Sequence, residues 1–202
     1  MKTLTKTTFA ILFAGVTLTS SGMNASASVN VPSATTTTKA LPSEKGFNKI
    51  WVAGNVKIVL TQSVNEGITV GEDFNAEKTS VQFKGQTLYI NSMESGQVTI
   101  NVAVKDLQRI EAAGSAVVVM GNNFDVKYLQ LFLSQSAKVK VNAIIGSLYT
   151  VINDNATLKM NGSAEEHTLL ASNMSNIKFG DFVCADTKLV PSTGVAIAGM
   201  AK

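Results

Sequence analysis

The segment Gly114-Ser-Ala-Val-Val-Val returns four times along the chain in altered form, as Ser136-Ala-Lys-Val-Lys-Val, Asn155-Ala-Thr-Leu-Lys-Met, Met174-Ser-Asn-Ile-Lys-Phe and, after a slip of one residue, Ser192-Thr-Gly-Val-Ala-Ile. Its fourth positions recur at intervals of 22, 19, 19 and 18 residues, and they hold the apolar residues Val117, Val139, Leu158, Ile177 and Val195. A period near twenty, made of short strands and turns, is typical of a β-solenoid, whose coils bury their inner faces by stacking. The sequence therefore predicts an all-β fold, a single-stranded parallel β-helix with coils of about 18–22 residues.

Alternating apolar residues extend this pattern toward the N-terminus, as in Val56-x-Ile58-x-Leu60 and Val98-x-Ile100-x-Val102-x-Val104. Period-two alternation indicates half-buried strands, and the many β-branched residues suit a pleated surface. Glycine, asparagine and aspartate separate the runs, for example at Lys84-Gly85 and Asn153-Asp-Asn155, where sharp corners need them. We expect residues 47–202 to form one β-solenoid domain with a continuous core.

The first 46 residues differ in composition from the rest of the chain. Lys2 and Lys6 precede an apolar stretch from Phe9 to Leu18 that leads into Ala25-Ser-Ala27, which predicts a signal peptide over residues 1–27, cleaved near Ala27. Residues 28–46, rich in threonine, serine and proline, are expected to form a linker. The apolar stretch is about half the ~20 residues of a membrane-spanning helix, so no transmembrane segment is predicted. We expect an exported protein, with periplasm, cell surface and extracellular space left open.

Charge and cysteine content point to no particular class of partner. Without Lys2 and Lys6 the chain has 15 basic and 14 acidic residues, a formal charge of +1. Nucleic-acid binding calls for a strongly basic face with interleaved aromatic residues, so we expect no nucleic-acid partner. The single cysteine, Cys184, cannot form an internal disulfide and is expected to be a small buried side chain.

The strand and turn residues carry a family resemblance. They are Phe47-x-x-Ile50-x-Val52-x-Gly54-x-Val56-x-Ile58, Leu88-x-Ile90, Leu107-x-x-Ile110 and Gly114-Ser115, followed by the recurring units. This pattern resembles the head GIN domain family, exported bacterial proteins described as "putative autotransporter adhesins", over roughly Phe47 to Ala198. The resemblance implies a single-stranded β-helix in the envelope or outside the cell, with no established enzyme activity.

Residues for catalysis or metal binding are sparse. Only Glu165-Glu166-His167 groups acids with the single histidine, and in an extended chain neighbouring side chains point to opposite faces. A zinc site needs further ligands, and no second histidine exists to supply one. We therefore expect a solvated turn with His167 at the start of a coil, and no catalytic residue, metal or cofactor. The protein is predicted not to be an enzyme.

Lysines align in the repeat. The residue between two inward apolar side chains is Val118, Lys140, Lys159 and Lys178 in successive units, and Lys138 occupies the preceding outward position. One interpretation is a solvated face that discourages edge-to-edge association of strands. The other is a row of ammonium groups that binds the phosphate or carboxylate groups of an envelope or host glycan.

The aromatic residues and the chain ends complete the prediction. Trp51, Tyr89, Tyr128 and Tyr149 belong to different coils and are not expected to share one sugar-stacking platform. The apolar end Val195–Lys202 favours packing between copies, which would give a homo-oligomer through the solenoid ends. The first interpretation is thus a non-catalytic binding or adhesion module with a glycan or protein ligand at the cell surface. The alternative is a structural self-associating envelope protein, and a carbohydrate-active enzyme has the least support.

Overall fold

A computed structural model describes residues 38–42, 46–72, 74–121 and 124–190 of the 202-residue chain. The predicted signal peptide, residues 28–37 and 43–45 of the predicted linker, and the end segment Val195–Lys202 lie outside the described residues. The described elements are β1 (Thr38–Leu41), β2 (Lys49–Gly54), β3 (Val56–Gln62), β4 (Gly67–Gly71), β5 (Thr79–Lys84), β6 (Thr87–Ser92), β7 (Val98–Val104), β8 (Arg109–Ala112), β9 (Val117–Met120), β10 (Phe124–Leu133), β11 (Lys138–Ile152), β12 (Thr157–Ala171), the 3-10 turn η1 (Met174–Asn176) and β13 (Ile177–Val190).

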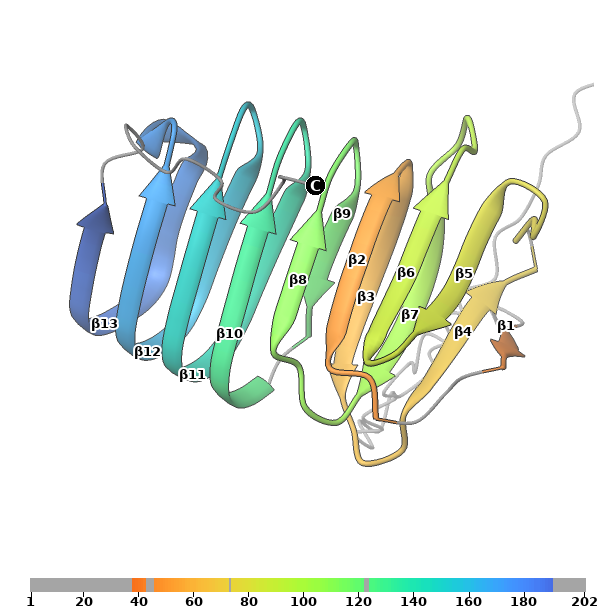
Figure 1. Ribbon diagram of the computed structural model, residues 1–202, viewed down its shortest axis with the longest axis horizontal. Coiled ribbons are helices and arrows are strands. Elements are labelled where there is room, and N and C mark those ends of the chain that lie inside the picture. Colours follow the sequence, from red (N-terminus) through yellow and green to blue (C-terminus); the bar gives the residue numbers. More distant parts are fainter. Residues whose placement is uncertain (1–37, 43–45, 73, 122–123, 191–202) are drawn as a thin grey trace, which may run out of the picture. The chain divides into compact units, whose positions relative to one another are not determined.

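These strands form one mixed sheet that curls around its own apolar core (Figure 1). Most neighbours are parallel, but β1 pairs with β4, β4 with β7 and β5 with β6 in antiparallel register. The all-β prediction is confirmed, whereas the single-stranded parallel β-helix is wrong, because a uniform solenoid contains no antiparallel pairs. In the described part of the chain, no helix is long and apolar enough to cross a membrane.

A hairpin explains one of the antiparallel pairs. Lys84 of β5 faces Thr87 of β6, so only Gly85 and Gln86 connect the two strands. A loop of two residues can join antiparallel neighbours only, since a parallel connection must return along the full length of the strand. Gly85 has a φ of 59°, which suits such a turn. The Lys84-Gly85 turn, expected to be a solenoid corner, is therefore a hairpin.

The strand order departs from a solenoid as well. β2 lies between β6 and β8, and β3 lies between β7 and β9. Sequential coils would place β2 and β3 at one end of the stack, with β6 and β7 next to β8 and β9. The same apolar alternation fits either order, so hydrophobic pattern alone does not decide between them.

The repeat pattern does predict neighbours in the C-terminal half. Val118, Val139, Leu158 and Ile177 pair in register across β9, β11, β12 and β13. The prediction is one residue off in the first unit, because Val118 is fully buried while Val117 is half-exposed on the outer face. β11 pairs with β9 through its first residues and with β10 through its later ones, so each long strand runs along both sides of the core.

The sheet thus presents two outward faces (Figure 1). We call the side formed by β6, β2, β8, β10 and the later halves of β11 to β13 the front wall. The rear wall consists of β7, β3, β9 and the first residues of β11 to β13. Side chains such as Ile50 and Ile110 from the front and Ile58 and Ile100 from the rear fill the core. Alternate residues on each wall point outward, and these outward residues are the ones available for function.

Candidate functional site

The rear wall carries the predicted lysines on its outer face. Lys140, Lys159 and Lys178 are paired neighbours on β11, β12 and β13, and all three are exposed. Lys138, also exposed, lies two residues before Lys140 on the same strand. We call these four residues the lysine row. The position beside Lys140 on β9 is held by Val119 and not by Val118 as predicted.

The lysine row concentrates positive charge. Adjacent strands lie about 4.8 Å apart, and like charges directly opposed across strands destabilise a sheet mildly. Lys159 has such a neighbour on each side. Among the ion pairs formed by the described residues, none involves the lysine row. An anion bound along the row would therefore relieve repulsion that the free protein tolerates.

A shallow groove of about 390 Å³ runs beside these lysines. The half-exposed side chains of Val117 and Val119 contribute apolar surface to it, and the lysine row supplies charged side chains. On the far side of Val117, β3 adds the half-buried Lys57. Methyl groups flanked by ammonium groups suit a ligand with acidic substituents on a partly apolar backbone, such as an acidic sugar chain.

The prediction that His167 lies in a solvated turn is wrong. His167 is in the middle of β12, 1% exposed, and its Nε2 lies 3.1 Å from the Thr150 hydroxyl on β11. The rings of Phe179 and Phe182 pack edge-on against it. Burial lowers the pKa of His167 to about 4, so the imidazole is neutral at physiological pH.

Glu165, Glu166 and His167 do not converge on a common site. Glu165 and Glu166 are exposed, whereas the His167 side chain is buried in the sheet. No group of three histidine, cysteine, aspartate or glutamate side chains that could hold a metal occurs in the described part of the chain. Cys184 is half-buried on β13, less enclosed than predicted. His167 therefore makes a structural contact with Thr150 inside the sheet and takes no part in a metal or catalytic site with these acids.

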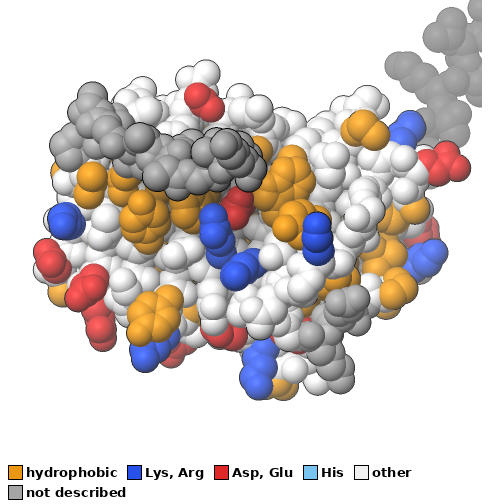
Figure 2. Space-filling view, viewed as in Figure 1, with side chains coloured by type: hydrophobic (Ala, Val, Ile, Leu, Met, Phe, Trp, Pro, Cys, Tyr) orange, Lys and Arg blue, Asp and Glu red, His pale blue; other side chains and the backbone are white. Residues whose placement is uncertain are grey.

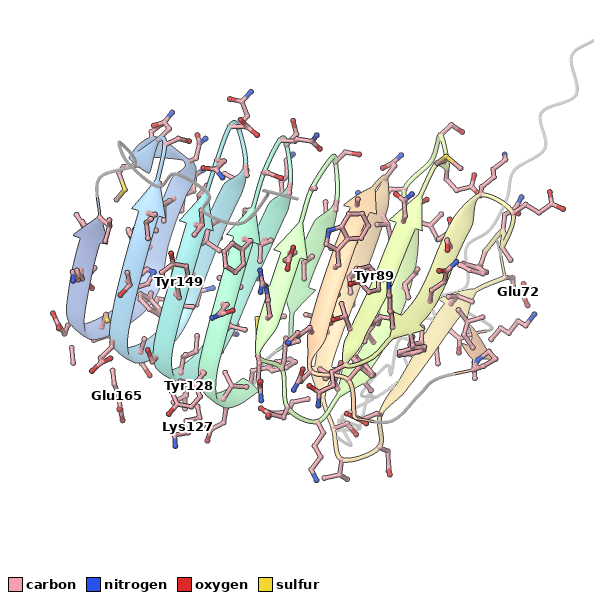
Figure 3. All side chains as sticks on the ribbon, viewed as in Figure 1. Glu72, Tyr89, Lys127, Tyr128, Tyr149 and Glu165 are labelled. Atoms are coloured by element: carbon pink, nitrogen blue, oxygen red, sulfur yellow. The ribbon has the colours of Figure 1, made fainter. Side chains whose placement is uncertain are left out.

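The front wall carries aromatic side chains in two neighbouring pairs, for which the sequence contains no local signal. Tyr89 and Trp51 are paired neighbours whose rings lie 6.0 Å apart, and the Phe132 and Tyr149 rings on β10 and β11 lie 5.9 Å apart. Figure 3 shows Tyr89 and Tyr149 on the same side of the sheet, and Tyr128 away from them. The prediction that the aromatic residues are spread apart is therefore wrong for Trp51 and Tyr89, whose rings are neighbours. Only the strand order, which places β2 next to β6 and β8, brings them together.

These features define an all-β domain built on one curled, mixed sheet, with a basic rear wall and an aromatic front wall. Residues 46–198 match the family described as "Putative auto-transporter adhesin, head GIN domain", and the chain belongs to that family. The resemblance seen in the strand and turn residues is thereby confirmed.

Solved structures share this fold. A "putative adhesin" from Bacteroides fragilis superposes with a TM-score of 0.66 at 20% sequence identity, covering 79% of this chain and 78% of the other. A "putative lipid binding protein" from Parabacteroides distasonis gives 0.53 at 13% identity, with 79% of each chain covered. A "putative adhesin" from the same species gives 0.51 at 13% identity, with 77% of each covered. No curated protein sequence matches the chain. At these identities the similarity shows the fold alone.

Proposed function

We propose that this protein is an exported, non-catalytic adhesion module that binds an anionic glycan through the lysine row of its rear wall. The single observation that carries the proposal is the register of Lys140, Lys159 and Lys178 on three adjacent strands. Membership of the family described as "Putative auto-transporter adhesin, head GIN domain" agrees with a role in binding at the cell surface.

The geometry of the row favours a polymer over a small anion. The paired lysines advance by one strand spacing, about 4.8 Å, at each step along the sheet. A chain with acidic groups at regular intervals can therefore contact several ammonium groups in succession. Each contact is weak in water, because exposed ion pairs contribute about 1 kcal/mol or less. Binding is expected to come from several contacts that form together and to weaken as salt increases.

The groove adds a preference for sugar chains. Val117 and Val119 offer apolar surface beside the lysines, and the C–H face of a sugar ring can rest on them. A catalytic role would need converging acid and base groups. The lysine row supplies charge of one sign only, so retention of an unaltered ligand is the function that it favours.

Alanine replacement of three lysines tests the proposal. The purified protein and its Lys140→Ala/Lys159→Ala/Lys178→Ala variant are passed over immobilised polygalacturonate, with neutral dextran as the blank matrix. We expect the variant to bind polygalacturonate about tenfold more weakly, and the parent protein to elute as salt rises from about 50 to 500 mM.

The matched control removes the same charge elsewhere. Lys84, Lys127 and Lys188 are exposed lysines outside the row, and their triple alanine variant has the same net charge as the test variant. It should bind polygalacturonate like the parent protein. Equal losses in the two variants would indicate a nonspecific charge effect, and undiminished binding by the test variant would remove the lysine row as the site.

A further inference from the structure

The front wall holds a second surface that the lysine row does not involve. Its outward residues run across the strands in the order Tyr89, Trp51, Glu111, Phe132 and Val151, each paired with the next. We call Tyr89, Trp51, Phe132 and Tyr149 the aromatic strip. Tyr89 is 38% exposed, and the other three rings are half-buried, so part of each ring remains open to a ligand.

A small pocket opens between the two halves of the strip. It has a volume of about 180 Å³, and Trp51, Glu111 and Phe132 line it together with Ala113, Ser134 and Asn153. The last three residues follow the carboxyl ends of β8, β10 and β11. Pockets for drug-sized molecules measure about 300–1,000 Å³, so this one suits a single small unit of a longer ligand.

Two charged residues of opposite sign, Arg109 and Glu111, lie beside the aromatic strip. Arg109 Nε lies 2.7 Å from Glu111 Oε1, and the Arg109 guanidinium stands 4.3 Å from the centre of the Phe132 ring. The guanidinium therefore lies against the Phe132 ring, and its ion pair with the partly exposed Glu111 offsets the charge of both groups. In Figure 2, which faces the front wall, hydrophobic side chains lie beside blue and red ones near the middle of the face. An uncharged ligand with hydroxyl groups fits this surface, because hydroxyls can donate to Glu111 and accept from Arg109.

We propose that the aromatic strip binds an extended chain of uncharged β-linked hexoses, which lies across the strands with one sugar in the pocket between Trp51 and Phe132. Trp51 and Phe132 are separated by one strand, β8, and hence by two strand spacings, about 10 Å. This distance is about the advance of two sugar units along an extended β-linked chain. The apolar C–H faces of the sugars contact the Trp51 and Tyr89 rings, while their hydroxyls reach the polar groups of the pocket and the Arg109 guanidinium that lies over Phe132.

The strip and the lysine row lie on opposite walls and call for different ligands. Neutral sugars gain nothing from the lysines, and binding to the strip is expected to change little with salt. The neutral-sugar surface is therefore independent of the polyanion site, and a variant of one wall should leave binding at the other wall unchanged.

Fluorescence gives a direct test, because Trp51 is the only tryptophan in the chain. The purified protein is titrated with cellohexaose, and its migration is measured in gels that contain hydroxyethylcellulose. We expect cellohexaose to shift the tryptophan emission, and hydroxyethylcellulose to retard the protein at low and high salt alike. Trp51→Ala and Phe132→Ala should each weaken retardation at least tenfold. The Phe132→Ala variant keeps Trp51, so cellohexaose binding can still be followed by fluorescence. The signal should saturate at a higher cellohexaose concentration than in the parent protein.

Tyr128→Ala is the matched control, since Tyr128 is an aromatic residue 55% exposed outside the strip. It should behave like the parent protein, and circular dichroism of all variants should show the same β-sheet spectrum. An unchanged emission with cellohexaose, or equal retardation of the Trp51→Ala variant, would overturn the proposal. A response of Trp51 to polygalacturonate and not to cellohexaose would overturn the neutral class of ligand.

Discussion

At the scale of single residues, the buried His167 makes the stability of the folded protein depend on pH. It is the only histidine, and it is enclosed by Thr150, Phe179 and Phe182. Its pKa is about 4 in the folded protein and about 6.5 in an unfolded chain. As pH falls through 6.5 the unfolded chain takes up a proton that the folded protein does not, so stability is full above pH 6.5 and declines below it.

We expect the free energy of unfolding to drop by about 2 kcal/mol from His167 alone between about pH 7.5 and pH 5. Urea denaturation at both pH values measures this change. The control is the His167→Leu/Thr150→Val variant, which removes both partners of the hydrogen bond and leaves no unsatisfied group. Its stability should vary much less over the same interval, and an equal pH dependence in the variant would assign the effect to other groups.

At the scale of elements, Gly54 holds the corner between β2 and β3. Its φ is 83°, and a Cβ at this position would overlap the carbonyl oxygen of Ser92 on the neighbouring strand β6. Gly54→Ala must therefore strain the backbone and also push two paired strands apart. We expect a loss of about 3–5 kcal/mol in the free energy of unfolding, measured by denaturant titration.

Gly85→Ala provides the comparison at the hairpin between β5 and β6. Gly85 also has a positive φ, 59°, but a Cβ there would meet nothing within 4 Å. Only the left-handed backbone is then penalised, and the expected loss is about 1–2 kcal/mol. Similar losses at the two sites would show that backbone strain, and not the approach of Ser92, makes glycine necessary at Gly54.

The elements also show what the sequence could predict. From β11 to β13 each repeat unit is one long strand and its turn, so aligned residues become paired neighbours, and the alignment of Lys140, Lys159 and Lys178 places them side by side. Between β1 and β7 the chain reverses and interleaves, and partners such as Ile58 and Ile100 are far apart in sequence. Alternation identifies the inward residues there, but it is the same for parallel and antiparallel partners. The aromatic strip depends on that interleaved order, and no local signal marks it.

At the scale of the whole molecule, the described sheet has a free edge at β13. β13 pairs with β12 alone, and it leaves Phe179, Val183 and Leu189 45%, 69% and 60% exposed. An unpaired strand with apolar side chains is a template for a further strand. Two copies of the same edge can meet around a two-fold axis, and this arrangement closes as a dimer instead of growing into a fibre.

We therefore expect the protein to form dimers through β13 as its concentration rises, which sedimentation velocity over a wide concentration range would detect. Val183→Lys/Leu189→Lys should shift the equilibrium to monomer, because two charges on each copy would then face each other across the edge. Val64→Lys is the control, since Val64 is 80% exposed in the loop between β3 and β4 and does not belong to this edge. A parent protein that stays monomeric over the whole concentration range would exclude assembly through β13. Any binding by the two walls would then take place within a single copy.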